Sequence, residues 1–149
     1  IIMRVCECRD IEIKIVLDSG ACNHVLDAED VPVYRVVESP GSRRGQNFIV
    51  GNGAGLPNEG QVRLNLEVPI GDAGRGPVQS TFQVADGMCR PLMSVAKVCD
   101  AGYSCLFTKT GASVLAKSKR EVCTFERMNG LYVADMKLKK PEPFTKPAP

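Results

Sequence analysis

The chain has 149 residues, which fits one compact domain with a core large enough to be stable without a metal or disulfide crosslinks. Hydrophobic residues make up 44% and charged residues 24% of the chain, the composition of an ordinary globular protein. The formal net charge is only +2 and no apolar run approaches the length of a membrane span, so we expect neither polyanion binding by the whole chain nor membrane insertion.

The sequence contains seven cysteines and a single histidine, His24. An odd number of cysteines without a recognisable secretory signal favours free thiols in a reducing compartment, so we expect a cytoplasmic protein. The pairs Cys6/Cys8 and Cys22/His24 are spaced more tightly than zinc ligands, which usually have about two to four residues between them. We therefore expect no metal site and no other cofactor. The lone histidine also makes Ser-His-Asp or Cys-His chemistry a poor hypothesis.

The first predicted element is a hairpin, with a strand at residues 1–6, a tight turn at 7–10 and an antiparallel strand at 11–17. Isoleucines alternate with other residues along the second strand, the period-two pattern of a half-buried strand. This strand runs into Asp18-Ser19-Gly20-Ala21. A carboxylate at the end of an apolar strand is costly unless it has a function, but Asp-Ser-Gly is also a common turn sequence. Both interpretations are open at this point.

The next segment, up to residue 45, is predicted to have little regular structure. Residues 25–30 are expected to form one short helical turn that Pro32 ends. Residues 31–37 are apolar enough for a strand, with the proline near its start, where a missing N–H is tolerated. Residues 39–45 are expected to form an exposed, basic loop.

A glycine-rich hairpin is predicted next. Residues 48–50 lead into Gly51-Asn52-Gly53-Ala54-Gly55, and strict alternation resumes at residues 62–68. Asn-Gly is a strong signal for a two-residue turn, because both central residues of a type I′ turn need positive φ. The glycines of this arm exceed what one turn needs. Two interpretations fit them: a mobile flap whose backbone approaches a ligand, or a flexible surface hairpin.

After a second turn at residues 71–77, a strand is predicted at 77–85 and a helix of about two turns follows Ser94. Ser94 is a suitable N-cap, and Gly102 suits the positive φ of a helix C-terminus. A strand at residues 103–107 follows. We further predict a hairpin extension at 108–135, in which 113–115 pairs with 122–125 and 131–133 adds a strand, and a basic, proline-rich linker at 136–149, for which nucleic-acid binding is not expected.

Four phrases of the sequence occur in a defined order: D-S-G-A-C-N-H-V at residues 18–25, V-G-N-G-A-G-L-P at 50–57, L-M-S-V-A-K-V-C-D-A-G-Y at 92–103 and N-G-L-Y-V at 129–133. Together they resemble the retropepsin family of aspartic proteases, and within it the protease segment of copia-type retrotransposon Gag-Pol polyproteins. The resemblance covers about residues 1–135. Retroviral members carry glycine at the position of Ser94, where copia-type members commonly have serine.

The resemblance implies an all-β fold, a retropepsin-like closed β-barrel with a glycine-rich flap hairpin and one short C-terminal helix, in which residues 1–107 form the protease domain. It also implies an aspartic endopeptidase that is active as a homodimer and processes its own polyprotein in the cytoplasm or within virus-like particles. Each subunit would supply one Asp18, since Asp-Ser-Gly occurs once in the chain. Of two carboxyl groups that face each other, one would hold a proton while the other activates a water molecule.

By the same resemblance, the catalytic loop consists of Asp18, Ser19 and Gly20. Ser19 would hydrogen-bond across the dimer interface, and the N–H of Gly20 would donate to the carboxylates. The resemblance places the peptide substrate against Ala21 and the arm residues Gly51, Asn52, Gly53, Ala54 and Gly55. The alternatives are a catalytically inactive dimerisation or peptide-binding module of the same fold and a basic nucleic-acid-binding β domain, which the nearly neutral charge disfavours.

Overall fold

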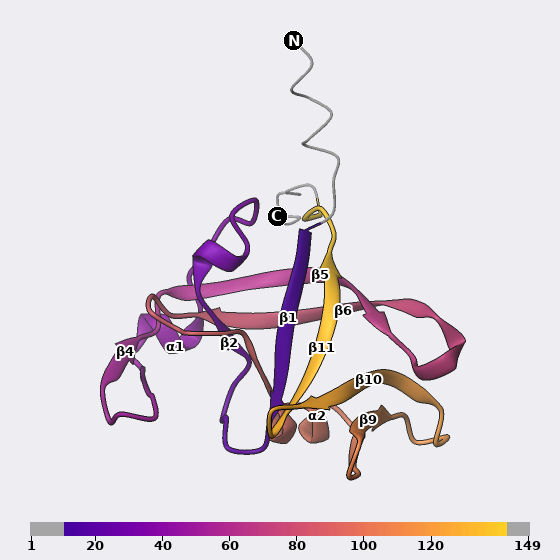
Figure 1. Cartoon of the computed structure of the whole chain (residues 1–149). Helices are drawn as coiled ribbons and strands as arrows, with labels where there is room; N and C mark the ends of the chain where they lie inside the picture. The colour runs from indigo at the N-terminus through magenta and orange to yellow at the C-terminus, as the bar shows by residue number, and fades with distance from the viewer. Residues whose placement is uncertain (1–10, 143–149) are drawn as a thin grey trace.

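The computed structural model describes residues 11–142, in which β-strands are the main regular element (Figure 1). The described strands are β1 (Ile11–Asp18), β2 (Val25–Leu26), β3 (Asn47–Ile49), β4 (Gly55–Pro57), β5 (Gly60–Pro69), β6 (Arg75–Val84), β7 (Leu92–Ser94), β8 (Ser104–Phe107), β9 (Gly111–Leu115), β10 (Glu121–Met128) and β11 (Leu131–Leu138). Between them lie the short helices α1 (Pro40–Arg43) and α2 (Val95–Asp100) and the 3₁₀ turns η2 (Ala28–Asp30) and η3 (Gly71–Ala73). The all-β prediction is confirmed. The strand predicted at residues 1–6 and the turn at 7–10 lie outside the described residues.

Nine of the described strands form one sheet in the order β1-β7-β2-β6-β5-β11-β10-β9-β8. β1 also pairs with β11, so the pairings run in a ring through β1, β7, β2, β6, β5 and β11. Figure 1 shows β1 and β11 side by side, with the long β5–β6 pair running across the view behind them. β3 and β4 form a separate two-stranded sheet, which is the predicted arm.

The core follows from the alternation of apolar residues along the strands. Every second residue of β5 is buried, and Phe82 of the neighbouring β6 is fully buried. Ile15 in β1 and Met136 in β11 are also fully buried. Burial of an apolar side chain of this size contributes about 1.5–3 kcal/mol to folding, so these strands hold the sheet together.

The last strands belong to this same sheet and core. The predicted pairing within residues 108–135 is confirmed, since β9 pairs with β10 and β10 with β11. β11 then pairs with β1 and β5, which lie in the segment predicted as the protease domain. The linker predicted from residue 136 is corrected, because Met136 and Leu138 are buried in the core and β11 runs to Leu138. The predicted helix after Ser94 is therefore followed by four described strands.

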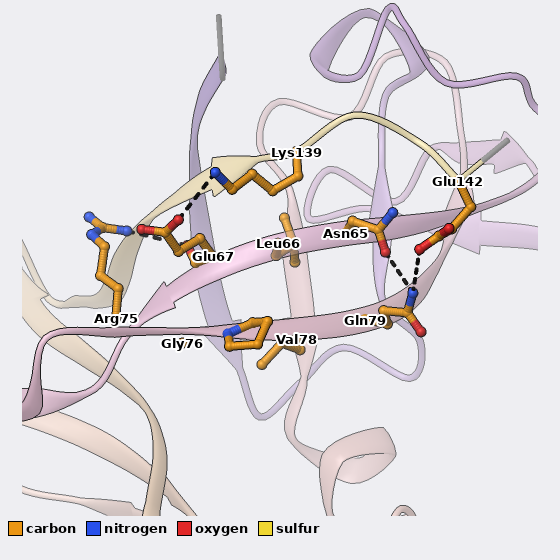
Figure 2. Close-up of a pocket in the computed structure, with 10 residues that line it drawn as sticks. Asn65, Leu66, Glu67, Arg75, Gly76, Val78, Gln79, Lys139 and Glu142 are labelled. Carbon is orange, nitrogen blue, oxygen red and sulfur yellow. Dashed lines mark hydrogen bonds and ion pairs between the residues drawn. The ribbon is translucent and has the colours of Figure 1, made fainter. Parts of the chain in front are cut away.

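The segment after β11 is held against β5 and β6, as Figure 2 shows. The hydroxyl of Tyr34 donates to the carbonyl oxygen of Lys139 at 2.7 Å and accepts from the backbone N–H of Asn65 at 3.0 Å. Gln79 Nε2 donates to Asn65 Oδ1 at 2.7 Å and to Glu142 Oε1 at 3.4 Å. A hollow of about 450 Å³ lies beside these contacts, and it contains none of the predicted site residues.

The strand predicted at residues 31–37 is wrong. Only Val37 pairs with the sheet, through a single bridge to Gln61. Val31 and Tyr34 are both buried, and the N–H of Tyr34 donates to the carbonyl oxygen of Val31 at 3.0 Å. A turn thus places both side chains in the core, which a strand with alternating faces could not do for residues three apart.

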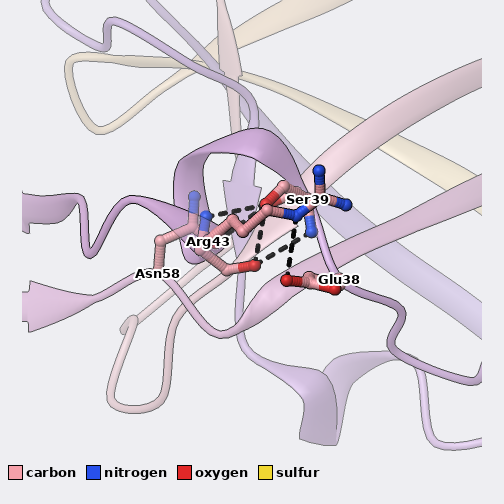
Figure 3. Close-up of polar contacts among 5 residues, drawn as sticks. Glu38, Ser39, Arg43 and Asn58 are labelled. Atoms are coloured by element: carbon pink, nitrogen blue, oxygen red, sulfur yellow. Dashed lines mark hydrogen bonds and ion pairs between the residues drawn. The ribbon is translucent and has the colours of Figure 1, made fainter.

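The basic loop predicted at residues 39–45 is also corrected, because α1 begins there (Figure 3). Ser39 Oγ accepts from the N–H of Ser42 at 3.1 Å, and Ser42 Oγ accepts from the N–H of Ser39 at 2.9 Å, which is a capping box. Ser39 is fully buried, with its hydroxyl 3.5 Å from Asn58 Oδ1. A local sequence pattern indicates this helix, because Ser39 can cap its start and Pro40 occupies the first helical position.

Candidate active site

The candidate catalytic carboxylate, Asp18, is the last residue of β1. β1 and β7 run parallel, and their register places Asp18 beside Ser94. The backbone N–H of Gly20 donates to Asp18 Oδ1 at 2.7 Å, so the turn after β1 closes onto the carboxylate. A Cβ at Gly20 would lie 3.3 Å from the same oxygen, so a side chain at this position would push against the carboxylate.

Ser94 ties the loop after Asp18 to the start of α2. Its buried hydroxyl donates to the carbonyl oxygen of Ala21 at 2.7 Å and accepts from the N–H of Lys97 at 3.1 Å. The predicted N-cap is therefore confirmed. The backbone N–H of Ser94 also donates to His24 Nδ1 at 2.9 Å. One residue thus fixes both the helix and the loop that carries the carboxylate.

His24 lies at the end of this loop with its ring packed 5.1 Å from that of Phe82, centroid to centroid. Burial, and to a lesser extent the positive charge of Lys97, lowers the pKa of His24 from 6.5 to about 4. Because Nδ1 accepts the Ser94 N–H, the neutral ring carries its proton on Nε2. His24 therefore keeps its acceptor at mildly acidic pH.

Because His24 is partly buried and its pKa is lowered, we expect the protein to lose stability as the pH falls. Between its usual pKa of 6.5 and its folded-state pKa of about 4, the unfolded chain binds a proton that the folded chain does not. The free energy of unfolding should decrease by up to about 3 kcal/mol across this window as the pH falls. Urea unfolding at pH 7, 6, 5 and 4 measures this decrease. In His24→Asn, whose amide oxygen can still accept the Ser94 N–H, the decrease should be smaller; an equal slope in both proteins would contradict the prediction.

The glycine-rich arm is the antiparallel pair of β3 and β4, so the arm exists but its second strand lies at residues 55–57, and the strand predicted at 62–68 pairs with β6 instead. Its turn differs from the predicted type I′, because among the residues at the tip only Gly53 has a positive φ, +84°. Instead, the side chain of Asn52 accepts from the N–H of Ala54 at 2.9 Å, and the N–H of Gly53 donates to the carbonyl oxygen of Val50 at 2.8 Å. A two-residue turn with two positive φ values does occur at Asn129-Gly130, between β10 and β11.

A groove of about 1270 Å³ lies along the Asp18 loop and the arm. Most of the predicted site residues line it: Asp18, Ser19, Gly20, Ala21, Gly51, Asn52 and Ala54. Gly53 and Gly55 belong to the same arm but are not among the residues that line the groove. The structure thus brings a carboxylate and a glycine-rich arm, separate in the sequence, to one concave surface.

Comparison of the chain with protein-family models, curated proteins and solved structures finds no match. The geometry of the groove is therefore the basis for assigning a function. No helix within residues 11–142 is long and apolar enough to cross a membrane. In the same part of the chain, no cluster of three or more His, Cys, Asp or Glu side chains could hold a metal ion.

Sequence reasoning missed a second wall of the groove. Phe107 from β8 and the turn that joins β10 to β11 also line it, with Leu131 and Tyr132 at the start of β11. The predicted division of the chain placed most of these residues in a separate extension. The Asn-Gly pair at 129–130 was a usable turn signal, but no local pattern could show that this turn lies beside Asp18.

Proposed function

We propose that the protein is an aspartic endopeptidase of the retropepsin type, active as a homodimer, which cleaves the retrotransposon polyprotein from which it derives. The observation that carries this proposal is the position of Asp18. Asp18 is the last residue of β1, and its carboxylate accepts a hydrogen bond from the N–H of Gly20 at 2.7 Å. It lines a groove of about 1270 Å³, which the glycine-rich arm also lines. The ring of strand pairings from β1 through β7 and back through β11 supports a barrel of the acid-protease type.

The homodimer follows from the number of carboxylates that the chemistry needs. In the two-carboxylate mechanism one carboxylate accepts the proton of the water while a second, protonated carboxyl group donates one to the peptide carbonyl. Asp18 is the only carboxylate among the described residues that line the groove. A second copy related by a two-fold axis would supply the other Asp18, and two carboxyl groups in contact share one proton because both cannot ionise together.

In this mechanism the ionised Asp18 takes a proton from a water molecule as the water oxygen attacks the peptide carbonyl carbon. The protonated Asp18 of the second copy gives its proton to the carbonyl oxygen, so a tetrahedral diol forms without a covalent link to the enzyme. The first Asp18, now protonated, then gives its proton to the amide nitrogen while the second, now ionised, takes a proton from one hydroxyl of the diol, so that the C–N bond breaks and the carboxylic acid and amine leave. The Gly20 N–H orients one carboxylate oxygen, and the arm would pair with the extended peptide and exclude water.

The loop network supports this chemistry at acidic pH. A shared proton between two carboxyl groups favours activity below neutral pH. His24 has a pKa of about 4, so it stays neutral there and continues to accept the N–H of Ser94, whose hydroxyl holds the Ala21 carbonyl. The loop that carries Asp18 should therefore keep its shape at mildly acidic pH.

The second candidate function is a catalytically inactive peptide-binding or dimerisation module of the same fold. The observation that favours it is the groove itself, which has a volume of about 1270 Å³ and does not depend on the protonation state of Asp18. The two functions differ in one result: only the enzyme cleaves the peptide it binds.

The rate of peptide cleavage is expected to rise faster than linearly with protein concentration. Each active site needs two chains, so the rate should approach the square of the concentration where the chain is mostly monomeric. The measurement is hydrolysis of a fluorogenic peptide library at mildly acidic pH, with sedimentation of the same samples to follow dimer formation. A folded chain that dimerises without cleaving any peptide would support the inactive module, and a strictly linear rate through the monomer–dimer transition would exclude the shared site.

A further inference from the structure

Two thiols are in contact where β8 follows α2. The side chains of Cys99, in the last turn of α2, and Cys105, in β8, are hydrogen-bonded to each other. Cys99 is exposed and Cys105 is half-buried. Neither is among the described residues that line the groove, so this thiol pair is separate from the candidate active site. A thiol that faces solvent thus contacts a second thiol that is sheltered.

The turn between α2 and β8 holds the thiol pair in place. The N–H of Tyr103 donates to the carbonyl oxygen of Val98 at 3.3 Å. The N–H of Gly102 donates to the carbonyl oxygen of Cys99 at 2.9 Å. With Gly102 at a φ of +98°, these two bonds form a Schellman motif. The chain therefore reverses directly after the helix, and Cys105 returns past its end.

A third cysteine, Cys123, lies near this pair but cannot replace either member. Cys105 of β8 and Cys123 of β10 both pair with Val114 of β9, so the two cysteines are on the same face of the sheet with one strand between them. Two strand spacings separate their Cα atoms by about 9.5 Å, whereas a disulfide needs less than about 7 Å. The geometry therefore allows a disulfide between Cys99 and Cys105 and not between Cys105 and Cys123.

The two thiols of the pair differ in their environment. Burial, and to a lesser extent the neighbouring Cys99, raises the pKa of Cys105 from 9.0 to about 11, so its thiol stays protonated at neutral pH. The thiolate is the form of cysteine that attacks an oxidant, and attack also needs access from solvent. The exposed Cys99 is therefore the thiol that reacts first, and Cys105 is placed to react second.

We propose that Cys99 and Cys105 form a reversible oxidation site, which reacts with hydroperoxides and closes to an intramolecular disulfide. In the first step the Cys99 thiolate sulfur attacks the terminal oxygen of the peroxide. The S–O bond forms, the O–O bond breaks, and the alkoxide or hydroxide that leaves takes up a proton. Cys99 is thereby oxidised to a sulfenic acid, and the peroxide is reduced to an alcohol or water.

In the second step the Cys105 sulfur attacks the sulfur of the Cys99 sulfenic acid. The S–S bond forms, the S–O bond breaks, and the hydroxyl group leaves with the Cys105 proton as water. Two thiols and one hydroperoxide thus give one disulfide, which a thiol reductant such as glutathione returns to the two thiols. Because the two side chains already touch, this step precedes further oxidation of Cys99 to the sulfinic acid. The site does not depend on the proposed protease function.

The test is oxidation of the purified full chain with hydrogen peroxide at pH 7, followed by thiol alkylation and tryptic mass mapping. Cleavage after Lys97 and Lys109 places both cysteines in one peptide, residues 98–109. This peptide should lose two hydrogen atoms and become resistant to alkylation, and dithiothreitol should reverse both changes. Sulfinic acid at Cys99 with Cys105 still open to alkylation would overturn the proposal, as would disulfides that mainly join other cysteines.

Two variants separate the roles of the thiols. In Cys105→Ser, Cys99 should accumulate as the sulfenic acid, which dimedone traps, and then as the sulfinic acid. Cys99→Ser should slow oxidation of Cys105 by about 10-fold, because a pKa of about 11 lowers the thiolate fraction about 100-fold and the greater nucleophilicity restores part of the rate. An unchanged rate for Cys105 would overturn the proposal. Cys89→Ser, which removes another exposed thiol, is the matched control and should leave the disulfide unchanged.

Discussion

Asp18→Asn is expected to abolish peptide hydrolysis while the protein stays folded and dimeric. Asparagine has nearly the same shape, and its amide oxygen can still accept the Gly20 N–H that Asp18 Oδ1 accepts at 2.7 Å. An amide neither accepts the proton of the attacking water nor donates one to the carbonyl oxygen. Acid–base catalysis by a positioned group contributes about 10²–10⁴-fold, so the rate should fall by at least this factor.

The control for this variant is Asp135→Asn, which removes an exposed carboxylate that pairs with Lys14 at 2.9 Å on the surface of β11. It should keep full activity, because a surface ion pair contributes little to stability. Mixing equal amounts of wild-type and Asp18→Asn chains gives a second test. Random pairing leaves about one quarter of the dimers with two wild-type chains, so the activity per wild-type chain should fall by about half. Unchanged activity per wild-type chain would mean that one chain is sufficient.

Gly60→Ala is expected to lower the free energy of unfolding by about 3–5 kcal/mol. Gly60 has a φ of +137°, a conformation that costs other residues about 1–3 kcal/mol. A Cβ there would overlap the carbonyl oxygen of Val37 and lie 2.8 Å from Val36 Cγ1, and overpacking of this kind adds about 1–3 kcal/mol. The same carbonyl accepts the Gln61 N–H at 2.7 Å, so the substitution would also disturb the bridge that joins residues 31–37 to β5.

Gly74→Ala is the matched control for this substitution. Gly74 has a φ of +96°, but a Cβ there would have no neighbour within 4 Å. Only the cost of the backbone conformation remains (φ +96°, ψ −122°), so we expect a loss of about 1–3 kcal/mol, without the added cost of crowding at Gly60. Urea unfolding at pH 7 measures both changes. If both variants lost the same free energy of unfolding, the structure around Gly60 would accommodate the added methyl group without a penalty, which would contradict the prediction.

Local sequence patterns predicted the elements that short-range physics controls. Alternating isoleucines indicated β1, and an apolar strand that stops at Asp18-Ser19-Gly20 indicated the loop in which Gly20 donates to the carboxylate. Ser94 was predicted as an N-cap because a hydroxyl can accept a helix N–H within three residues, and it does so from Lys97. The arm was predicted from its glycines, although the side chain of Asn52 gave its turn another geometry.

The sequence by itself thus determined the all-β class, the position of the carboxylate at a strand end, the glycine-rich arm and the hairpin within residues 108–135. Only the tertiary structure decided which of these lie together. Val16 pairs with Val133, and Ser94 bonds to His24 from 70 residues away, because buried surfaces and backbone hydrogen bonds must all be satisfied at once. No local periodicity encodes such pairings, since many registers present the same alternating pattern. For this reason the contribution of Phe107 and Leu131 to the groove that contains Asp18 became visible only in the folded chain.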